Sequence, residues 1–232
     1  MKTLTQFALV TLVLLSIARS GLAGGPNQAP IRDSQRVMQT RVKTWTDFRD
    51  DHVIKQKRDY SCGAAALATI AHYYWGDDVT ENDVLDVLEE YLTEELLADR
   101  VKNGLAISDL RLVAVKMGYV STIGKLEIDK IREVKVPLIV ALRLEEFDHF
   151  VVVRGFSDGW VYLADPGRGN IRITERKFQQ QWIKNAVLVV AKKGQTGAKN
   201  SELSIGFEEL TRGWLNDQVI RTFPEKVFTS PH

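Results

Sequence analysis

The sequence predicts an α+β fold in which helices come first along the chain and an antiparallel sheet follows. From residue 62 to residue 117, apolar residues recur at helical spacing. After Gly118 the pattern changes to short apolar runs separated by turn signals such as Ser157-Asp158-Gly159. Runs of this kind are typical of strands joined by hairpins.

Three helices are expected in the first half, and each carries a start or a stop signal. A serine, threonine or aspartate before an apolar run can cap a helix, and a glycine after the run can end it. The first helix is expected to follow Ser61 and end at Gly76. The second is expected to follow Thr80, with Asp83 in a pattern resembling a capping box. The third is expected to begin at Ser108 with Asp109 and to end at Gly118.

The second half is expected to contain six strands and two short helices. Residues 150–156 are the most apolar of these strands. The other expected strands are residues 119–123, 138–144, 161–163, 171–173 and 187–190, and the short helices are residues 128–134 and 175–182.

Composition divides the chain into four segments. Residues 1–23 combine Lys2, an apolar run and small residues before a cleavage position, which is the pattern of a secretory signal peptide. The run is short for a membrane span, although an uncleaved N-terminal anchor remains an alternative. Residues 24–50 are expected to be a lead-in and residues 51–193 the main domain. Residues 194–232 form an extension whose apolar side chains can pack back as a helical appendage (Phe207, Leu210, Trp214, Leu215, Val219 and Ile220).

Charge and hydropathy exclude some classes of partner. Removal of residues 1–23 leaves 29 basic and 30 acidic residues, a net charge near −1. Because no basic block stands out, we expect no nucleic-acid partner. No other stretch is long and apolar enough to cross a membrane, so we expect an exported protein without an integral span after signal removal.

Cys62 is the only cysteine in the 232 residues. It opens the first expected helix, where backbone N–H groups and the helix dipole favour a thiolate. Gln56, six residues upstream, offers a side-chain amide. A lone cysteine is usually a small buried apolar residue. In an exported protein, however, a cysteine without a partner in its own chain is either intermolecular or a free reactive thiol, which favours a nucleophile.

His149 is the best candidate base for this thiol. It begins the most apolar strand, and Asp165 ends the next one. An antiparallel hairpin places those two ends side by side, where a carboxylate can orient an imidazole. Alternatives remain open. His149 can be a structural histidine at a strand edge, and Asp165 can be a turn residue before Pro166. The acid that orients His149 can also be one of three others near it in the sequence (Glu145, Glu146 and Asp148).

Other kinds of site find no support in the sequence. One cysteine and four dispersed histidines do not have the ligand spacing of a zinc site. A phosphate-binding glycine loop and a nucleotide fingerprint are both missing. We therefore expect neither a metal nor a cofactor.

Three stretches together resemble the C39 family of cysteine peptidases. They are Gln56-x-x-Asp59-x-x-Cys62-Gly63-x-Ala65-x-Leu67, then His149-Phe150-Val151-Val152-Val153, then Asp165-Pro166 followed by a glycine-containing turn, Phe178 and Trp182. The resemblance covers roughly residues 50–191. It implies a papain-like fold, with helices packed on an antiparallel sheet. It also implies the site roles of nucleophile for Cys62, base for His149, orienting residue for Asp165 and oxyanion donor for Gln56.

One departure from the family affects the expected substrate. The best-known members cut leader peptides after a double glycine, as cytosolic domains of ABC exporters. This chain lacks a transmembrane bundle and a Walker A motif and carries a signal peptide, so it resembles stand-alone exported members, including a periplasmic one of functional-amyloid secretion. We expect a periplasmic cysteine peptidase acting on an amyloid subunit or another secretion-system protein. The alternative is a papain-like binding or chaperone module of a secretion complex with little turnover.

Overall fold

The computed structural model describes residues 28–32, 37–41, 45–144, 147–198, 201–207 and 209–210. The chain divides into two units, Met1–Phe48 and Arg49–His232. In the first unit, β1 (Gln28–Arg32) pairs antiparallel with β2 (Val37–Arg41). A short helix, α2 (Trp45–Arg49), follows. The expected signal peptide lies outside the described residues, so the structure does not test it.

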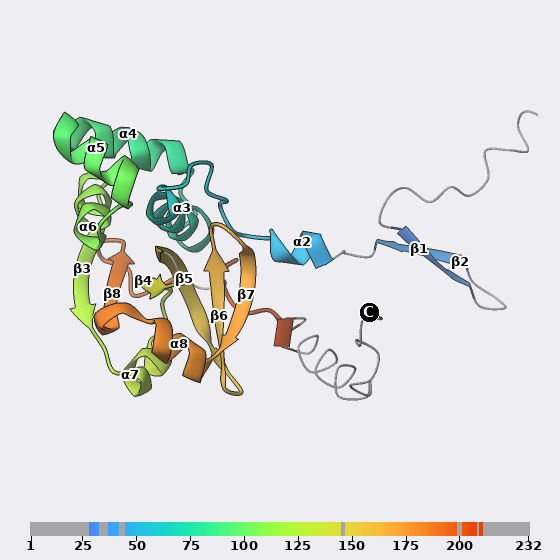
Figure 1. Cartoon of the computed structure of the whole chain (residues 1–232). Coiled ribbons are helices and arrows are strands. Elements are labelled where there is room, and N and C mark those ends of the chain that lie inside the picture. Colours follow the sequence, from blue (N-terminus) through green and yellow to red (C-terminus); the bar gives the residue numbers. More distant parts are fainter. Residues whose placement is uncertain are drawn as a thin grey trace, which may run out of the picture. The chain divides into compact units, whose positions relative to one another are not determined.

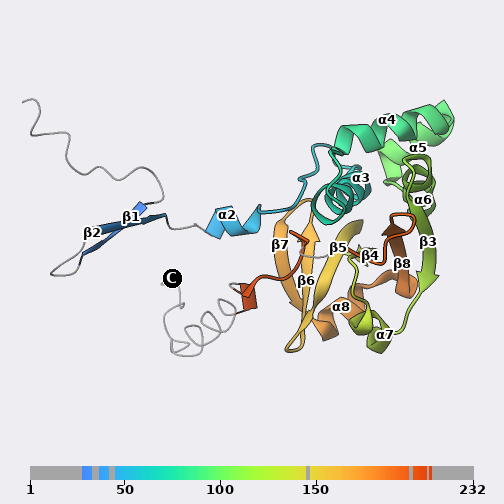
Figure 2. The same cartoon turned by 180° about the vertical axis from the view of Figure 1, so that it is seen from behind.

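Four α-helices occupy the first half of the second unit (Figures 1 and 2). They are α3 (Cys62–Thr69), α4 (Glu81–Tyr91), α5 (Glu94–Asn103) and α6 (Ile107–Lys116). A π-helical turn, Ile70–Tyr74, continues α3. The chain then leaves the helix at Gly76, whose φ of +72° suits glycine.

The helix signals proved partly right. Thr80 and Asp83 form the expected capping box, since the Thr80 N–H donates to Asp83 Oδ2 at 2.7 Å. Ser61 makes no side-chain capping bond: its hydroxyl oxygen accepts the Arg58 N–H, and its hydroxyl proton is directed to Glu81. Ser108 is also not a cap: α6 starts one residue earlier, and the Ala106 N–H donates to Asp109.

Six strands of the second unit form one antiparallel sheet in the order β3-β8-β4-β5-β6-β7. All six expected strands are present, with bounds that differ by a few residues at most. The strands are β3 (Val120–Lys125), β4 (Leu138–Arg143), β5 (Asp148–Ser157), β6 (Trp160–Asp165), β7 (Gly169–Thr174) and β8 (Ala186–Ala191). The two expected short helices are α7 (Ile128–Glu133) and α8 (Glu175–Gln181), and a 3-10 turn, Ile183–Asn185, follows α8.

Alternating side chains of the strands build one core on each face of the sheet. On β5, Val152 packs with residues of α3, α4 and α6, whereas Val151 and Val153 pack with Phe178 of α8. Figures 1 and 2 show α3 to α6 gathered on one side and α7 and α8 on the other. This arrangement confirms the expected α+β fold and buries the middle of β5 completely.

Part of the C-terminal extension is integrated into the second unit. Leu203 is 2% exposed and belongs to the core around α3. Arg154 is the extra residue of a bulge in β5. Its guanidinium pairs with Glu209 at 2.6 Å and donates to the carbonyl oxygens of Leu203 and Ser204. These contacts involve none of the apolar residues for which packing was expected. Phe207 is 78% exposed, and Trp214, Leu215, Val219 and Ile220 lie outside the described residues.

Among the residues that the structure describes, no helix has the length and apolar character needed to cross a bilayer.

Candidate active site

The sulfhydryl of Cys62 lies at the first residue of α3, almost completely buried with 6% exposure. Gly63 explains how this helix start packs so tightly on the sheet. A Cβ at Gly63 would lie 2.9 Å from Leu110 Cδ1 and 3.1 Å from Phe150 Cδ2. Glycine therefore lets α3 approach β5, the strand that carries the candidate base, and the expected position of Cys62 at a helix start is confirmed.

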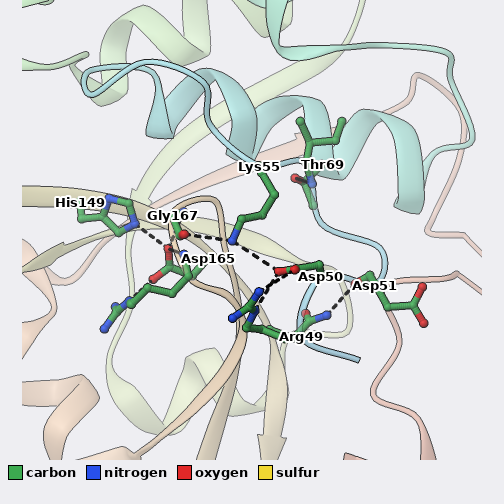
Figure 3. A network of polar contacts seen from close by, with 11 residues as sticks. Arg49, Asp50, Asp51, Lys55, Thr69, His149, Asp165 and Gly167 are labelled. Atoms are coloured by element: carbon green, nitrogen blue, oxygen red, sulfur yellow. Dashed lines mark hydrogen bonds and ion pairs between the residues drawn. The ribbon is translucent and has the colours of Figure 1, made fainter. Parts of the chain in front are cut away.

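His149 and Asp165 meet as the hairpin interpretation predicts. In the β5–β6 register, Val152 faces Ala164, so one further step places Asp165 opposite Val151, two residues from His149. The side chains join through a hydrogen bond of 2.8 Å between His149 Nε2 and Asp165 Oδ1 (Figure 3). Both residues are buried, Asp165 completely. Because Nε2 faces Asp165, Nδ1 is the ring nitrogen left for the thiol.

Asp165 also organises the turn that follows it. Its Oδ1 accepts the N–H groups of Gly167 at 2.8 Å and Arg168 at 3.0 Å, and its Oδ2 accepts Arg168 Nε at 2.7 Å. The turn role that the sequence left as an alternative thus coexists with the contact to His149. Arg168 was not recognised from the sequence, although its place two residues after Pro166 puts it within reach of Asp165.

Two opposing effects act on the pKa of His149. Burial lowers this pKa, but the hydrogen bonds to Asp165 and to Cys62 outweigh burial and raise it to about 9. Burial likewise favours the neutral form of Asp165, yet His149 and Arg168 hold the pKa of this carboxyl well below its usual range. At neutral pH the pair therefore consists of an imidazolium and a carboxylate, and the imidazolium lies beside the Cys62 sulfur.

Gln56 is held at the same site by its backbone and its amide. Its N–H donates to the Pro166 carbonyl at 3.0 Å, which ties it to the Asp165 turn. Its Nε2 donates to the Arg58 carbonyl at 3.0 Å and lies 3.5 Å from the Asp59 carbonyl. Its Oε1 is buried and has no hydrogen-bond partner among the described residues.

A polar network behind the site joins the segment before Gln56 to the Asp165 turn (Figure 3). Lys55 Nζ donates to the Gly167 carbonyl at 2.9 Å and lies 3.6 Å from Asp50, which also binds Arg49. These contacts fix the segment before Gln56 to the turn that follows Asp165. Lys55 had no signal in the sequence, because its partner is a backbone atom more than a hundred residues away.

The candidate residues open onto one cleft of about 500 Å³. Its rim is partly apolar and carries Phe147, 57% exposed, and Val101, 50% exposed. A surface aromatic next to a polar site suits contact with a polypeptide. The described lining residues are Gln56, Asp59, Tyr60, Cys62, Val101, Lys102, Asn103, Gly104, Leu144, Phe147, Asp148, His149, Asp165, Gly167 and Arg168.

The rival candidates do not join this constellation. Asp148 pairs with Arg143 on the surface, and Glu145 and Glu146 lie outside the described residues. His72 lies in the π-helical turn beyond α3, where its ring packs against Tyr73. Within the described ranges, no three histidine, cysteine, aspartate or glutamate side chains are grouped to hold a metal.

Gly167 faces the centre of the constellation. A Cβ there would lie 3.3 Å from Asp165 Oδ1, 3.6 Å from Gln56 Oε1 and 3.7 Å from His149 Cε1. We expect Gly167→Ala to lower kcat/KM about tenfold, because the added methyl group crowds Asp165 Oδ1 and so shifts the carboxylate that orients His149. Gly124→Ala is the matched control, because its nearest neighbour would be 3.8 Å away. Equal activity of both variants would contradict this expectation.

Comparison with known proteins identifies the family. The model of the Peptidase C39 family matches residues 50–195. The chain belongs to the peptidase C39 family. The match covers helices α3 to α8, the six-stranded sheet and every candidate residue of the site, so the resemblance found in the sequence is confirmed.

Two relatives of this C39 protein are similar over 142 residues. The chain is 30% identical over 142 residues to the "Probable functional amyloid protease FapD" of Pseudomonas fluorescens and 28% identical over 142 residues to the protein of that name from Pseudomonas aeruginosa. Each alignment covers 61% of this chain and 62% of the relative. The chain thus spans less than two thirds of the length of these relatives.

A solved structure supports the fold. The crystal structure of the peptidase domain of Streptococcus ComA, a bifunctional ABC transporter, matches this C39 protein with a TM-score of 0.51. The match covers 61% of this chain and 98% of that domain at 18% identity. The papain-like architecture implied by the resemblance is therefore confirmed.

Proposed function

We propose that this C39 protein is an exported cysteine peptidase that cleaves a peptide bond in a secreted protein. The observation that carries the proposal is the hydrogen bond from His149 to Asp165 beside Cys62, in a cleft open to a polypeptide. A thiol, an imidazole and a carboxylate in this order are the components of nucleophilic acyl transfer.

In the proposed reaction His149 moves the proton, Cys62 forms the bond to the substrate, and the other groups stabilise charge. His149 holds the proton taken from Cys62, and the thiolate attacks the peptide carbonyl carbon to form a tetrahedral intermediate. The Cys62 N–H and one N–H of the Gln56 amide stabilise the oxyanion, and a single donor of this kind contributes about 2.7–4 kcal/mol. His149 then protonates the leaving amine, and water hydrolyses the thioester. Asp165 orients the ring and stabilises the imidazolium throughout.

Gln56 can serve this role because an amide nitrogen carries two hydrogens. One hydrogen is used by the Arg58 carbonyl. Among the described residues, the only other acceptor that Nε2 has is the Asp59 carbonyl, at the 3.5 Å limit of a hydrogen bond, so the second hydrogen remains for an oxyanion.

The cellular setting is part of the proposal. The signal-like residues 1–23 support export to the periplasm. The names of the two Pseudomonas relatives support a protein of a functional-amyloid system as the substrate. Double-glycine specificity is not included, because leaders of that type are normally removed before or during export.

The test compares wild type with Cys62→Ala. We expect purified wild-type protein to cleave a candidate amyloid-system protein at one position, and Cys62→Ala to bind without cleavage while keeping its circular dichroism spectrum. Mass spectrometry of protein termini in the secreted fraction identifies the site. Complex formation without cleavage by either form would instead support the binding module.

A further inference from the structure

Glu81 is a buried carboxylate that the proposed mechanism does not use. It is 1% exposed and is the first residue of α4. Its Oε1 accepts the Lys57 N–H at 3.0 Å and contacts the Ser61 hydroxyl. Burying a carboxylate is unfavourable unless its hydrogen bonds and the local field compensate. Here the helix N-terminus supplies a favourable field, and both donors to Oε1 come from the loop between Gln56 and Cys62, while Oε2 is buried without a hydrogen-bond partner among the described residues.

The hydrogen bonds inside this loop form a connected chain. Ser61 Oγ accepts the Arg58 N–H at 3.2 Å and lies 2.8 Å from the Arg58 carbonyl. That carbonyl already accepts the Ser61 N–H at 3.2 Å and Gln56 Nε2 at 3.0 Å. Because a hydroxyl has one proton, and Glu81 is its closer acceptor, we assign the Ser61 proton to Glu81. Glu81 is thus linked through Ser61 and Arg58 to the Gln56 amide.

We propose that Glu81 is a positioning residue for the two oxyanion donors, an inference that rests on the proposed function. The Gln56 amide and the Cys62 N–H lie at the two ends of the loop. Glu81, on a separate helix, binds the residue next to each end, Lys57 and Ser61. A shift of the loop by a fraction of an ångström would misplace both donors. Thiolate formation depends on His149 and Asp165, which lie on β5 and β6 and do not contact Glu81.

This separation allows an experiment with two small probes. p-Nitrophenyl acetate acylates the thiol through a tetrahedral oxyanion, whereas iodoacetamide alkylates it by direct displacement without one. We expect Glu81→Met to slow acylation at least tenfold while the alkylation rate stays within twofold of wild type. Glu81→Gln keeps an acceptor oxygen and should recover most of the acylation rate. Glu90→Met, an exposed position on the same helix, is the control.

A double-mutant cycle tests the route through Gln56. If Glu81 acts by placing the amide, Glu81→Met should add little to the acylation defect of Gln56→Ala. Equal slowing of both probes in Glu81→Met, an unchanged acylation rate, or fully additive effects would overturn the proposal. If Glu81→Met fails to fold, Ser61→Ala removes the next link and should show the same selective loss.

Failure of the proposed function would give a different result. A wild-type thiol that reacts with both probes no faster than free cysteine would overturn the peptidase, whatever Glu81 does. The positioning role is then tested by nuclear magnetic resonance. Glu81→Met should shift the Cys62 backbone and Gln56 side-chain amide signals, and Glu81→Gln should restore them. Unchanged signals in Glu81→Met would reject the role of Glu81 alone.

Discussion

Replacing His149 with glutamine is expected to lower the rate of peptide-bond cleavage by about 10²–10⁴-fold. Glutamine can still contact Asp165, but it cannot take the proton from Cys62 or return one to the leaving amine. The same variant should lose rapid alkylation of Cys62 near pH 6, because no imidazolium then stabilises the thiolate. Both rates can be measured on the purified protein, by peptide cleavage and by mass-detected alkylation.

His72→Gln is the matched control for this substitution, because His72 lies in the π-helical turn beyond α3. It should leave both rates near those of wild type. Alkylation of wild type near pH 6 at the slow rate of an ordinary thiol would exclude an activated pair of Cys62 and His149.

The raised pKa of His149 also sets the direction of the pH dependence. With this pKa at about 9, turnover should fall as the pH rises through 9, because a neutral ring cannot protonate the leaving amine.

The raised pKa of His149 also affects the stability of the folded protein. The folded state holds this proton more tightly than the unfolded chain, so the stabilisation of about 3 kcal/mol is complete below about pH 6.5 and is lost as the pH rises toward 9. Urea unfolding at several pH values should show this decline in wild type and a flatter profile in His149→Gln.

Asp165→Asn is expected to lower turnover about 10²-fold or more and to destabilise the fold by about 2–4 kcal/mol at neutral pH. An asparagine oxygen can still accept from Gly167 and Arg168, but its NH₂ group then faces Arg168 Nε–H. The ring of His149 loses its charged partner while burial continues to favour the neutral form. The pKa of His149 should therefore fall, and the upper limit of the pH–rate profile should move below 9.

The loss of stability at acidic pH tests the role of Asp165 in a second way. Because its pKa is depressed in the folded state, its carboxylate stabilises the protein above the ordinary aspartate range, and this contribution is lost as the pH falls below about 4. Asp165→Asn should remove that part of the acid sensitivity. A pH–rate profile and an acid-unfolding curve like those of wild type would show that Asp165 does not act on His149.

The sequence was sufficient for those parts of the site that local patterns determine. Residues 150–156 show a strand pattern, and Ser157-Asp158-Gly159 marks a turn after them. Together they define a hairpin, and this hairpin brings His149 next to Asp165. The lone Cys62 at a helix start and the nearby Gln56 follow from adjacency along the chain. Their catalytic roles remain predictions, because position alone does not show reactivity.

The residues that were missed act across long distances in the sequence. Lys55 binds the carbonyl of Gly167, and any residue type offers a carbonyl, so no pattern marks the partner. Glu81 looks like an ordinary acid in the first turn of an amphipathic helix. Only the packing of α4 against the Gln56–Cys62 loop shows that its carboxylate is buried. The same contact explains the wrong prediction for Ser61: its hydroxyl donates to Glu81 and accepts the Arg58 N–H, so its oxygen does not accept an N–H group of its own helix.

The contact between Arg154 and the C-terminal extension has a consequence for how the protein is made. The family match ends at residue 195, yet Leu203 completes the main core and Glu209 neutralises a guanidinium whose side chain is 4% exposed. Four of the five acceptors around that guanidinium come from Leu203, Ser204 and Glu209. A chain still being synthesised or translocated therefore has a strand β5 with an unneutralised buried charge until residue 209 arrives. The segment from Leu203 to Glu209, which lies beyond the family match, thus contributes to when this unit completes its folding.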